Sequence, residues 1–231
     1  MTYPILLSPH TTVSSSTGKF VISTNGKNKK TGASELVAFS HVMRLGLDCI
    51  QENISVTING HRYEPDLVYI NKEKGIFVDI EIDEPYSGGH HPTHYLTNDG
   101  KHVDSKRNET FLNAGWYVLR FTEQQMFCQT AECMGFLFEL LINLGAMDAL
   151  PRSLSKATQP KSEPCRTANE AKALSCQNYR KTYLGYNPIK MDLVSHLRCC
   201  QLIVPILIQS ITNKRIRRMM MKQLKGFFDR Y

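Results

Sequence analysis

Three acidic residues at alternate positions are the feature of this chain that could do chemistry. They are Asp79, Glu81 and Asp83, in the segment Ile-Phe-Val-Asp-Ile-Glu-Ile-Asp that ends at Asp83. Side chains alternate between the two faces of a strand, so the three carboxylates would share one face and the isoleucines the other. Aligned carboxylates repel one another unless a cation neutralises them, and Mg²⁺ prefers oxygen ligands. The alternative is an antiparallel strand with one core face and one solvated acidic face.

The composition is that of an ordinary globular protein. The chain has 231 residues, of which 42% are hydrophobic and 21% charged, so it can form one sizeable core with an appendage or two small domains. We expect no secretory signal, because residues 11–32 are polar and no apolar region precedes them. We expect no membrane span, because the longest apolar stretch, 202–208, is short and contains a proline. The seven cysteines are odd in number and include no Cys-x-x-Cys pair. A reduced, cytoplasmic protein is therefore expected.

Charge is distributed unevenly along the chain. Residues 1–150 contain 12 basic and 17 acidic residues, a net charge of −5, whereas residues 151–231 contain 16 basic and 4 acidic residues, a net charge of +12. This asymmetry predicts a basic appendage on an acidic body, with a polyanion as its natural partner. The alternative is a solvated basic tail without a specific ligand.

Hydrophobic periodicity predicts the order of the elements. Helices are expected over about 34–45, 103–114 and 123–144, and strands over 54–58, 62–70, 76–83 and 116–122. The crossover through the helix at 103–114 should place strand 116–122 parallel to a neighbour. We therefore predict an α/β fold with a mixed β-sheet flanked by helices.

Less regular segments lie on both sides of this pattern. Residues 1–32 form a polar N-terminal segment, and residues 151–165, with prolines, serines and lysines but no periodicity, predict a linker. The linker leads to a basic helical C-terminal region, 166–231.

The last predicted helix, 213–230, is amphipathic and basic. Its candidate nucleic-acid-binding residues are Lys214, Arg215, Arg217, Arg218, Lys222 and Lys225. Such a helix suits nucleic acid, an anionic membrane surface or a partner groove. We expect nucleic acid; the alternatives are packing on its own domain and a homodimer or protein partner held through the C-terminal helices.

Six motifs follow one another in the order of the predicted elements. They are Glu35 early in the first helix, Pro65-Asp66, Glu81-Ile82-Asp83, a loop with His90, His91 and His94, Asp104-x-x-Arg107, and Gly115-Trp116 leading to Arg120-Phe121. Over residues 33–144 the chain thus resembles the PD-(D/E)xK nuclease superfamily, and within it small nucleases related to the very-short-patch-repair endonucleases. The resemblance implies a restriction-endonuclease-like fold for the domain 33–150.

The resemblance also implies Mg²⁺- or Mn²⁺-dependent hydrolysis of a nucleic-acid phosphodiester, with DNA as the expected substrate. Asp66, Glu81 and Asp83 would bind the metal, and Glu35 would assist. An acid in the first turn of a helix also has a simpler explanation, because the helix dipole favours it there. One of the loop histidines would assist as an acid–base group or as a ligand, or all three would be exposed and idle.

The superfamily's usual lysine, two positions after the strand acid, is missing. Its place is taken by Glu81 or by Asp83, depending on which acid is counted first. Lys106 or Arg107 on the following helix could replace it by steadying charge on the phosphate. If neither does, the expected protein is a catalytically inactive nuclease-fold protein that binds nucleic acid or acts as an assembly factor.

Overall fold

The computed structural model describes residues 1–10, 20–24, 39–40, 42–43, 49–88 and 90–184. The chain divides into two compact units, Met1–Ile189 and Lys190–Tyr231. The second unit lies outside the described residues, and so do Glu35 and the basic helix expected over 213–230.

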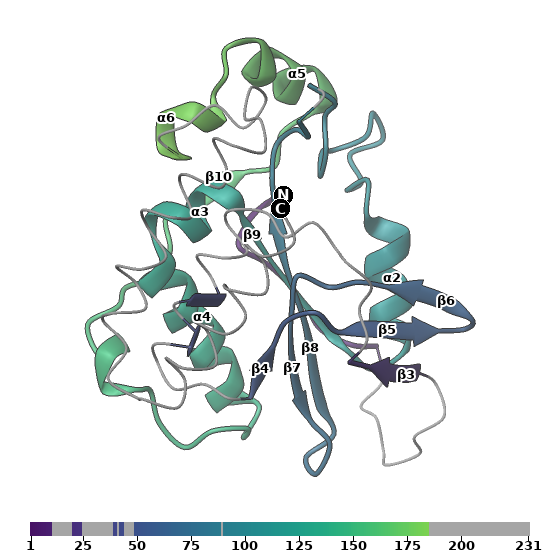
Figure 1. The fold of residues 1–231 in the computed structure, drawn as a ribbon, viewed down its shortest axis with the longest axis vertical. Coiled ribbons are helices and arrows are strands. Elements are labelled where there is room, and N and C mark those ends of the chain that lie inside the picture. Colours follow the sequence, from purple (N-terminus) through teal and green to yellow (C-terminus); the bar gives the residue numbers. More distant parts are fainter. Residues whose placement is uncertain (11–19, 25–38, 41, 44–48, 89, 185–231) are drawn as a thin grey trace, which may run out of the picture. The chain divides into compact units, whose positions relative to one another are not determined.

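A five-stranded sheet forms the centre of the first unit (Figure 1). Its strand order is β2 (Ile5–Leu7), β9 (Tyr117–Thr122), β8 (Ile76–Asp83), β7 (Leu67–Asn71) and β4 (Ile50–Gln51). Strands β8 and β9 are parallel, and the other neighbouring pairs are antiparallel. Helix α2 (Ser105–Asn113) lies between β8 and β9 in the chain, so the predicted crossover and the mixed sheet are confirmed.

Two hydrophobic cores lie on opposite faces of this sheet. The alternate apolar residues of β8, from Ile76 to Ile82, pack in the core that contains α4 (Thr130–Asn143) and Met126 of α3 (Glu123–Cys128). Phe77 belongs to the other core, with Phe111 of α2 and the buried Trp116. All eight residues of β8 are buried, so both faces of the strand are covered, and this fixes its register.

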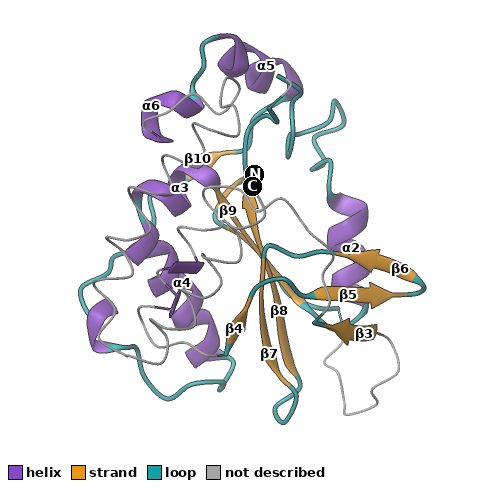
Figure 2. Cartoon of the chain, viewed as in Figure 1, coloured by secondary structure: helices purple, strands orange, loops and turns teal. Residues whose placement is uncertain are grey.

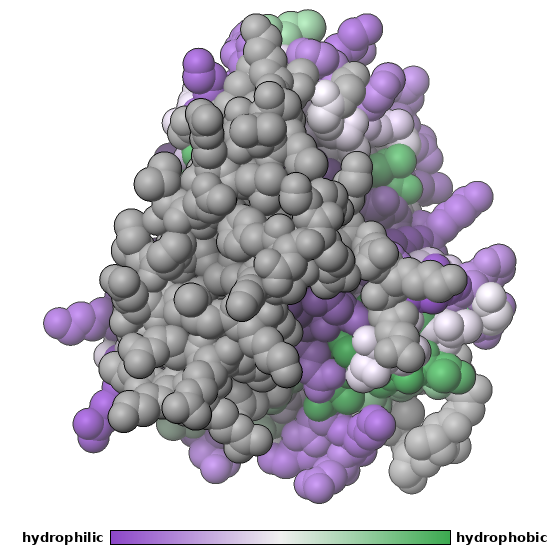
Figure 3. All heavy atoms as spheres, viewed as in Figure 1, coloured by the Kyte–Doolittle hydropathy of each residue, from purple (hydrophilic) through white to green (hydrophobic). Residues whose placement is uncertain are grey.

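A second sheet covers the α2 side. It consists of β3 (Phe20–Ser23), β5 (Ser55–Ile58) and β6 (His61–Tyr63), in the order β3-β5-β6 (Figure 2). Figure 3 shows a hydrophobic patch where Figure 1 labels β3, and Val21 of that strand is 66% exposed.

The strand predicted over 62–70 is two strands in different sheets. Strand β6 ends at Tyr63 and β7 begins at Leu67. Pro65 lies between them, and because proline has no N–H it cannot continue a hydrogen-bonded ladder. The break places Asp66 immediately before β7. The helix predicted over 123–144 is likewise divided, because Gln129 leaves helical geometry with φ of −133°.

The described parts of the predicted polar N-terminal segment and of the predicted linker pair and pack within the first unit. Strand β1 (Thr2–Tyr3) pairs with β10 (Glu163–Pro164), and Tyr3 is buried. Between α4 and β10, the short helix η1 (Arg152–Leu154) buries Leu154 in the core of α4. Leu154 and β10 thus anchor parts of 151–165 to the first unit.

The basic segment after β10 forms two short helices, α5 (Ala168–Cys176) and α6 (Arg180–Leu184). Thr167 and Glu170 form a capping box that starts α5, which satisfies two backbone donors reciprocally. None of the helices in the described part of the chain is long and apolar enough to cross a membrane.

Candidate functional site

The acidic face of β8 lies inside the protein. Asp79, Glu81 and Asp83 are 0%, 8% and 4% exposed, and the parallel register places Arg120 of β9 beside Glu81. The alternative of a solvated acidic face is therefore wrong. Buried carboxylates need partners, since transfer of an unpaired charge from water costs several kcal/mol or more. Two arginines supply them.

Arg107 neutralises the first part of the acidic face. From α2 its Nη1 and Nη2 donate to the two oxygens of Asp79, over 2.6 and 3.0 Å, and Nη2 also donates to Glu81 Oε1 over 2.6 Å. Its guanidinium stands 4.6 Å from the centre of the Phe111 ring. Although burial disfavours the charged form, the carboxylates of Asp79 and Glu81 raise the pKa of Arg107.

Asp66, immediately before β7, lies beside Glu81 of β8. The backbone N–H of Ile82 donates to Asp66 Oδ2 over 2.7 Å, and the N–H of Asp66 donates to Glu81 Oε1 over 3.4 Å. Burial raises the pKa of Glu81 well above its usual range; the carboxylates of Asp79 and Asp66 act in the same direction, and Arg107 opposes them. A further cation beside Asp66 and Glu81 would favour the ionised form of Glu81.

The oxygens of Asp66 and Glu81 suit a hard dication. Mg²⁺ is usually held by one or two carboxylates and keeps several waters. The pair thus matches the donor chemistry expected of a magnesium or manganese site.

Asp83 belongs to a second cluster, built around Arg120. Arg120 donates from Nε and Nη2 to the two oxygens of Asp83, over 2.8 and 2.7 Å, and from Nη1 to Asn108 Oδ1 over 2.9 Å. The hydroxyl of Tyr3 adds a 2.7 Å bond to Asp83 Oδ2. Burial acts to raise the pKa of Asp83, but Arg120 and the nearby His94 outweigh it, and the pKa is lowered.

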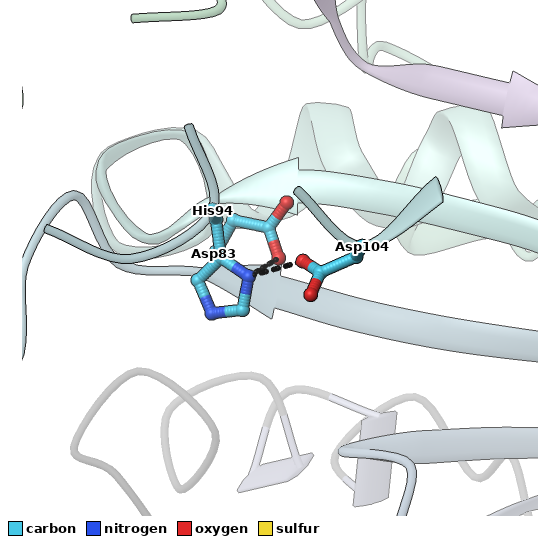
Figure 4. Close-up of side chains that lie close together, drawn as sticks. All are labelled: Asp83, His94 and Asp104. Atoms are coloured by element: carbon cyan, nitrogen blue, oxygen red, sulfur yellow. Dashed lines mark hydrogen bonds and ion pairs between the residues drawn. The ribbon is translucent and has the colours of Figure 1, made fainter. Parts of the chain in front are cut away.

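His94 and Asp104 complete this second cluster (Figure 4). His94 Nδ1 lies 2.7 Å from Asp104 Oδ2 and 3.4 Å from Asp83 Oδ1, and Arg120 Nη2 donates to Asp104 Oδ2 over 2.8 Å. Burial opposes the charge on His94, but Asp83, Asp104 and Glu84 raise its pKa to about 9. One ligand atom from each of Asp83, His94 and Asp104 lies within 4.8 Å of the others, so this group could hold a metal ion.

The expected metal set of Asp66, Glu81 and Asp83 is therefore divided between two clusters. Same-face neighbours on a strand are about 7 Å apart, and each acid has a different arginine: Arg107 contacts Glu81, and Arg120 contacts Asp83. Asp66 and Glu81 remain together, whereas Asp83 joins side chains from the loop after β8 and from the start of α2.

Of the two candidates for the missing lysine, Arg107 is the one that contacts the acids. Lys106 is exposed, and consecutive residues on a helix do not face the same way. In the histidine loop His90 and His91 are exposed, and His94 is the member held between carboxylates.

Sequence reasoning missed two members of the second cluster. Arg120 was named only as part of the last motif, with no role assigned; it alternates along β9 with Leu119 and Phe121, and its side chain is not exposed at all. The register with Glu81 was the available signal. Tyr3 gave no signal, because its partner Asp83 is 80 residues away in the chain.

A small pocket reaches the second cluster from outside. Asp83 and His94 line it, together with Tyr3, Glu84, Pro85, Thr93, Thr122, Arg166 and Ala171. Two of the three possible metal ligands thus line the pocket, and Asp104 does not.

Comparison with known proteins assigns no family to this chain. No family model, no curated protein and no solved structure matches the chain. The function has to be inferred from the chemistry of the two clusters, since a fold alone does not define one.

Proposed function

We propose that this chain is a metal-dependent endonuclease of restriction-endonuclease-like fold that hydrolyses phosphodiester bonds in DNA, with Mg²⁺ or Mn²⁺ as cofactor. The observation that carries the proposal is the contact of Asp66 with Glu81 where β7 begins beside β8; Glu81 is buried there and its pKa is raised well above the usual range. A dication bound between these two side chains would stabilise their ionised carboxylates.

The chain's own residues would divide the work. Asp66 and Glu81 would hold the ion, and the N–H of Ile82 orients Asp66 through its 2.7 Å bond. A bound ion supplies polarisation of the scissile phosphate and a lower pKa for the attacking water.

Arg107 is the proposed replacement for the superfamily lysine. Its guanidinium lies against Glu81 and is fixed by two bonds to Asp79. The planar fork of arginine suits a phosphate, and a fixed positive charge beside the reacting group stabilises the charge that develops in the transition state.

The basic region 166–231 would hold the DNA, in a cytoplasmic protein that can also use its C-terminal helices for a homodimer or protein partner. Contacts of lysine and arginine with phosphates release counterions, so this binding would weaken steeply as salt rises.

A second function is favoured by the contacts of Arg107. Arg107 already neutralises Asp79 and Glu81, and β8 carries no lysine. A protein in which Arg107 permanently replaced the metal would bind nucleic acid, or serve in an assembly, without cutting.

The test is cleavage of supercoiled plasmid and single-stranded DNA with Mg²⁺ or Mn²⁺, comparing wild type with Glu81→Gln. Glu73→Gln is the matched control, because Glu73 is an exposed acid in the turn that leads into β8. Metal-dependent cutting that is lost in Glu81→Gln and kept in Glu73→Gln supports the nuclease. Salt-sensitive DNA binding without cutting supports the second function.

A further inference from the structure

The two carboxylate oxygens of Glu81 have different surroundings. Oε1 accepts a hydrogen bond of 2.6 Å from Arg107 Nη2 and one of 3.4 Å from the backbone N–H of Asp66. Within the described part of the chain Oε2 accepts none, although the Glu81 side chain is only 10% exposed. Oε2 is therefore the oxygen of Glu81 that can bind an ion without first losing a protein partner.

Arg107 is shared unequally between the two acids that it contacts. Its Nη1 and Nη2 donate to the two oxygens of Asp79, over 2.6 and 3.0 Å, whereas only Nη2 reaches Glu81. A carboxylate bound through both terminal nitrogens fixes the plane of a guanidinium, because the two parallel bonds allow one geometry. The Asp79 side chain is 0% exposed and that of Arg107 is 18% exposed, so Asp79 holds Arg107 from the inner side.

Without Asp79, Arg107 would have a different best partner. Same-face neighbours on a strand are about 7 Å apart, so Glu81 is the next carboxylate within reach of the guanidinium. A largely buried cation needs a partner, and the two-bond arrangement is the stronger one. Arg107 would then turn toward Glu81 and bind Oε2 as well as Oε1, which would leave no oxygen of Glu81 for an ion.

The charges lead to the same conclusion. Asp79 and Arg107 form a neutral pair through their two hydrogen bonds. Ionised Asp66 and Glu81 then carry together the two negative charges that balance a dication. If Arg107 paired with Glu81 instead, only one of these charges would remain, and the affinity of carboxylate sites for hard cations depends on the number of charged ligands.

We propose that Asp79 is a positioning residue of the Asp66–Glu81 pair: it holds Arg107 on its own two oxygens and so keeps Oε2 of Glu81 available to a dication. This role rests on the proposed function, because it requires an ion at Asp66 and Glu81. It also gives a purpose to a third acid on β8 that does not itself bind the ion, since both of its oxygens accept from Arg107.

The test measures metal binding rather than cutting. The full chain, stripped of metal with a chelator, is titrated with Mn²⁺, and free Mn²⁺ is followed by electron paramagnetic resonance. Asp79→Asn keeps the size of the side chain and removes its charge and one acceptor oxygen. We expect this variant to bind Mn²⁺ about 10- to 100-fold more weakly, which is the usual effect of losing a partner outside the ligands themselves. Asp148→Asn, at an exposed aspartate, is the matched control and should bind as wild type does.

A second background separates positioning by Asp79 from the effect of its charge alone. The same substitution is made in Arg107→Met, and the affinities of Arg107→Met and of Asp79→Asn with Arg107→Met are compared. Because Asp79 acts through Arg107, these two variants should agree within about twofold, whereas independent effects would add. Circular dichroism and urea denaturation show that each variant is folded.

The wild-type chain provides a further measurement, which decides the question if Asp79→Asn does not fold. The guanidinium protons of Arg107 are followed by nuclear magnetic resonance and assigned from their absence in Arg107→Met. They should exchange slowly with water and stay slow when Mg²⁺ is added, because the bonds to Asp79 persist when the ion binds.

Four results would overturn the role of Asp79. They are wild-type Mn²⁺ affinity in folded Asp79→Asn, an equal loss of affinity in both backgrounds, release of the Arg107 protons by Mg²⁺, and absence of Mn²⁺ binding in the wild-type chain. Failure of the nuclease proposal looks different: a wild-type chain that binds Mn²⁺ as expected but cuts no DNA refutes the nuclease and keeps the role of Asp79. Cutting that persists in Asp79→Asn with unchanged Mn²⁺ affinity does the reverse.

Discussion

Arg120 donates two hydrogen bonds to Asp83, of 2.8 Å from Nε and 2.7 Å from Nη2, in a place where neither side chain is appreciably exposed. The same guanidinium reaches Asp104, so one buried charge holds two acids from different elements. Removing one partner of such a pair leaves an uncompensated buried charge, which costs about 3 to 5 kcal/mol.

Arg120→Met should therefore lower the free energy of unfolding by about 3 to 5 kcal/mol in metal-free protein. Urea denaturation measures it, with Arg152→Met, at an exposed arginine of η1, as the control. The double variant Arg120→Met with Asp83→Asn should recover part of the loss, since it removes the unpaired charge. A loss below about 1 kcal/mol, the range of exposed pairs, would contradict the prediction.

Arg107→Met should reduce the rate of DNA cleavage by about 10²- to 10³-fold, because it removes a fixed cation from beside the Asp66–Glu81 pair. Arg107→Lys should retain part of the activity. Lys106→Met is the matched control one position away, and it should cut as wild type does. Single-turnover cleavage measures all three; loss in Lys106→Met with normal Arg107→Met would reverse the assignment.

Arg180 ties α6 to the start of α3 and to the loop after β8. Its guanidinium donates to both oxygens of Glu123, over 2.7 and 2.6 Å, and to the carbonyl of Tyr86 over 2.9 Å. Arg180→Met should speed amide hydrogen exchange in α6 while leaving α2 protected, because local opening follows the loss of local contacts. The exposed neighbour Lys181 provides the control, Lys181→Met, for which exchange in α6 should stay at the wild-type rate.

The cysteines should differ sharply in reactivity. Burial raises the pKa of Cys165 to about 11, whereas Cys176 is exposed. The thiolate is the reactive form, so at pH 8 Cys165 should react with iodoacetamide at least about a hundredfold more slowly than Cys176. Peptide mass spectrometry follows both sites, and in strong denaturant the difference should vanish. Equal rates in the folded protein would mean that the pairing of β1 with β10 opens readily.

The features of the fold that could be predicted from the sequence are those set by the alternation of side chains along a strand and by the order of the elements. The period of two in β8 predicts its two faces, and the helix between β8 and β9 predicts their parallel pairing. The division at Pro65 was missed because Arg62–Ile70 has strand-forming residues on both sides of it. The predicted strand is interrupted at Pro65, because proline has no backbone N–H to donate to a neighbouring strand.

The partners of the acids were harder to predict, because they come from distant segments. Asp66 and Glu81 are placed together by the pairing of β7 with β8, which the sequence order indicates. Tyr3 meets Asp83 only through the packing of β2 against β9 and of β1 against β10. Such contacts leave no periodic trace in the sequence, and the same is true of the group that Asp83 forms with His94 and Asp104.

The pairing of β1 with β10 has a consequence for the order of folding. Tyr3 lies opposite Glu163, so during synthesis its final strand partner leaves the ribosome about 160 residues later. Contacts of such long range form slowly, and a strand edge that stays unpaired until they form makes the folding intermediate prone to aggregation. The acidic residues of β8 can form their ion pairs with Arg107 and Arg120 earlier. The hydrogen bond from the hydroxyl of Tyr3 to Asp83 should form as one of the last steps. The earliest part of the chain would thus be among the last to be enclosed.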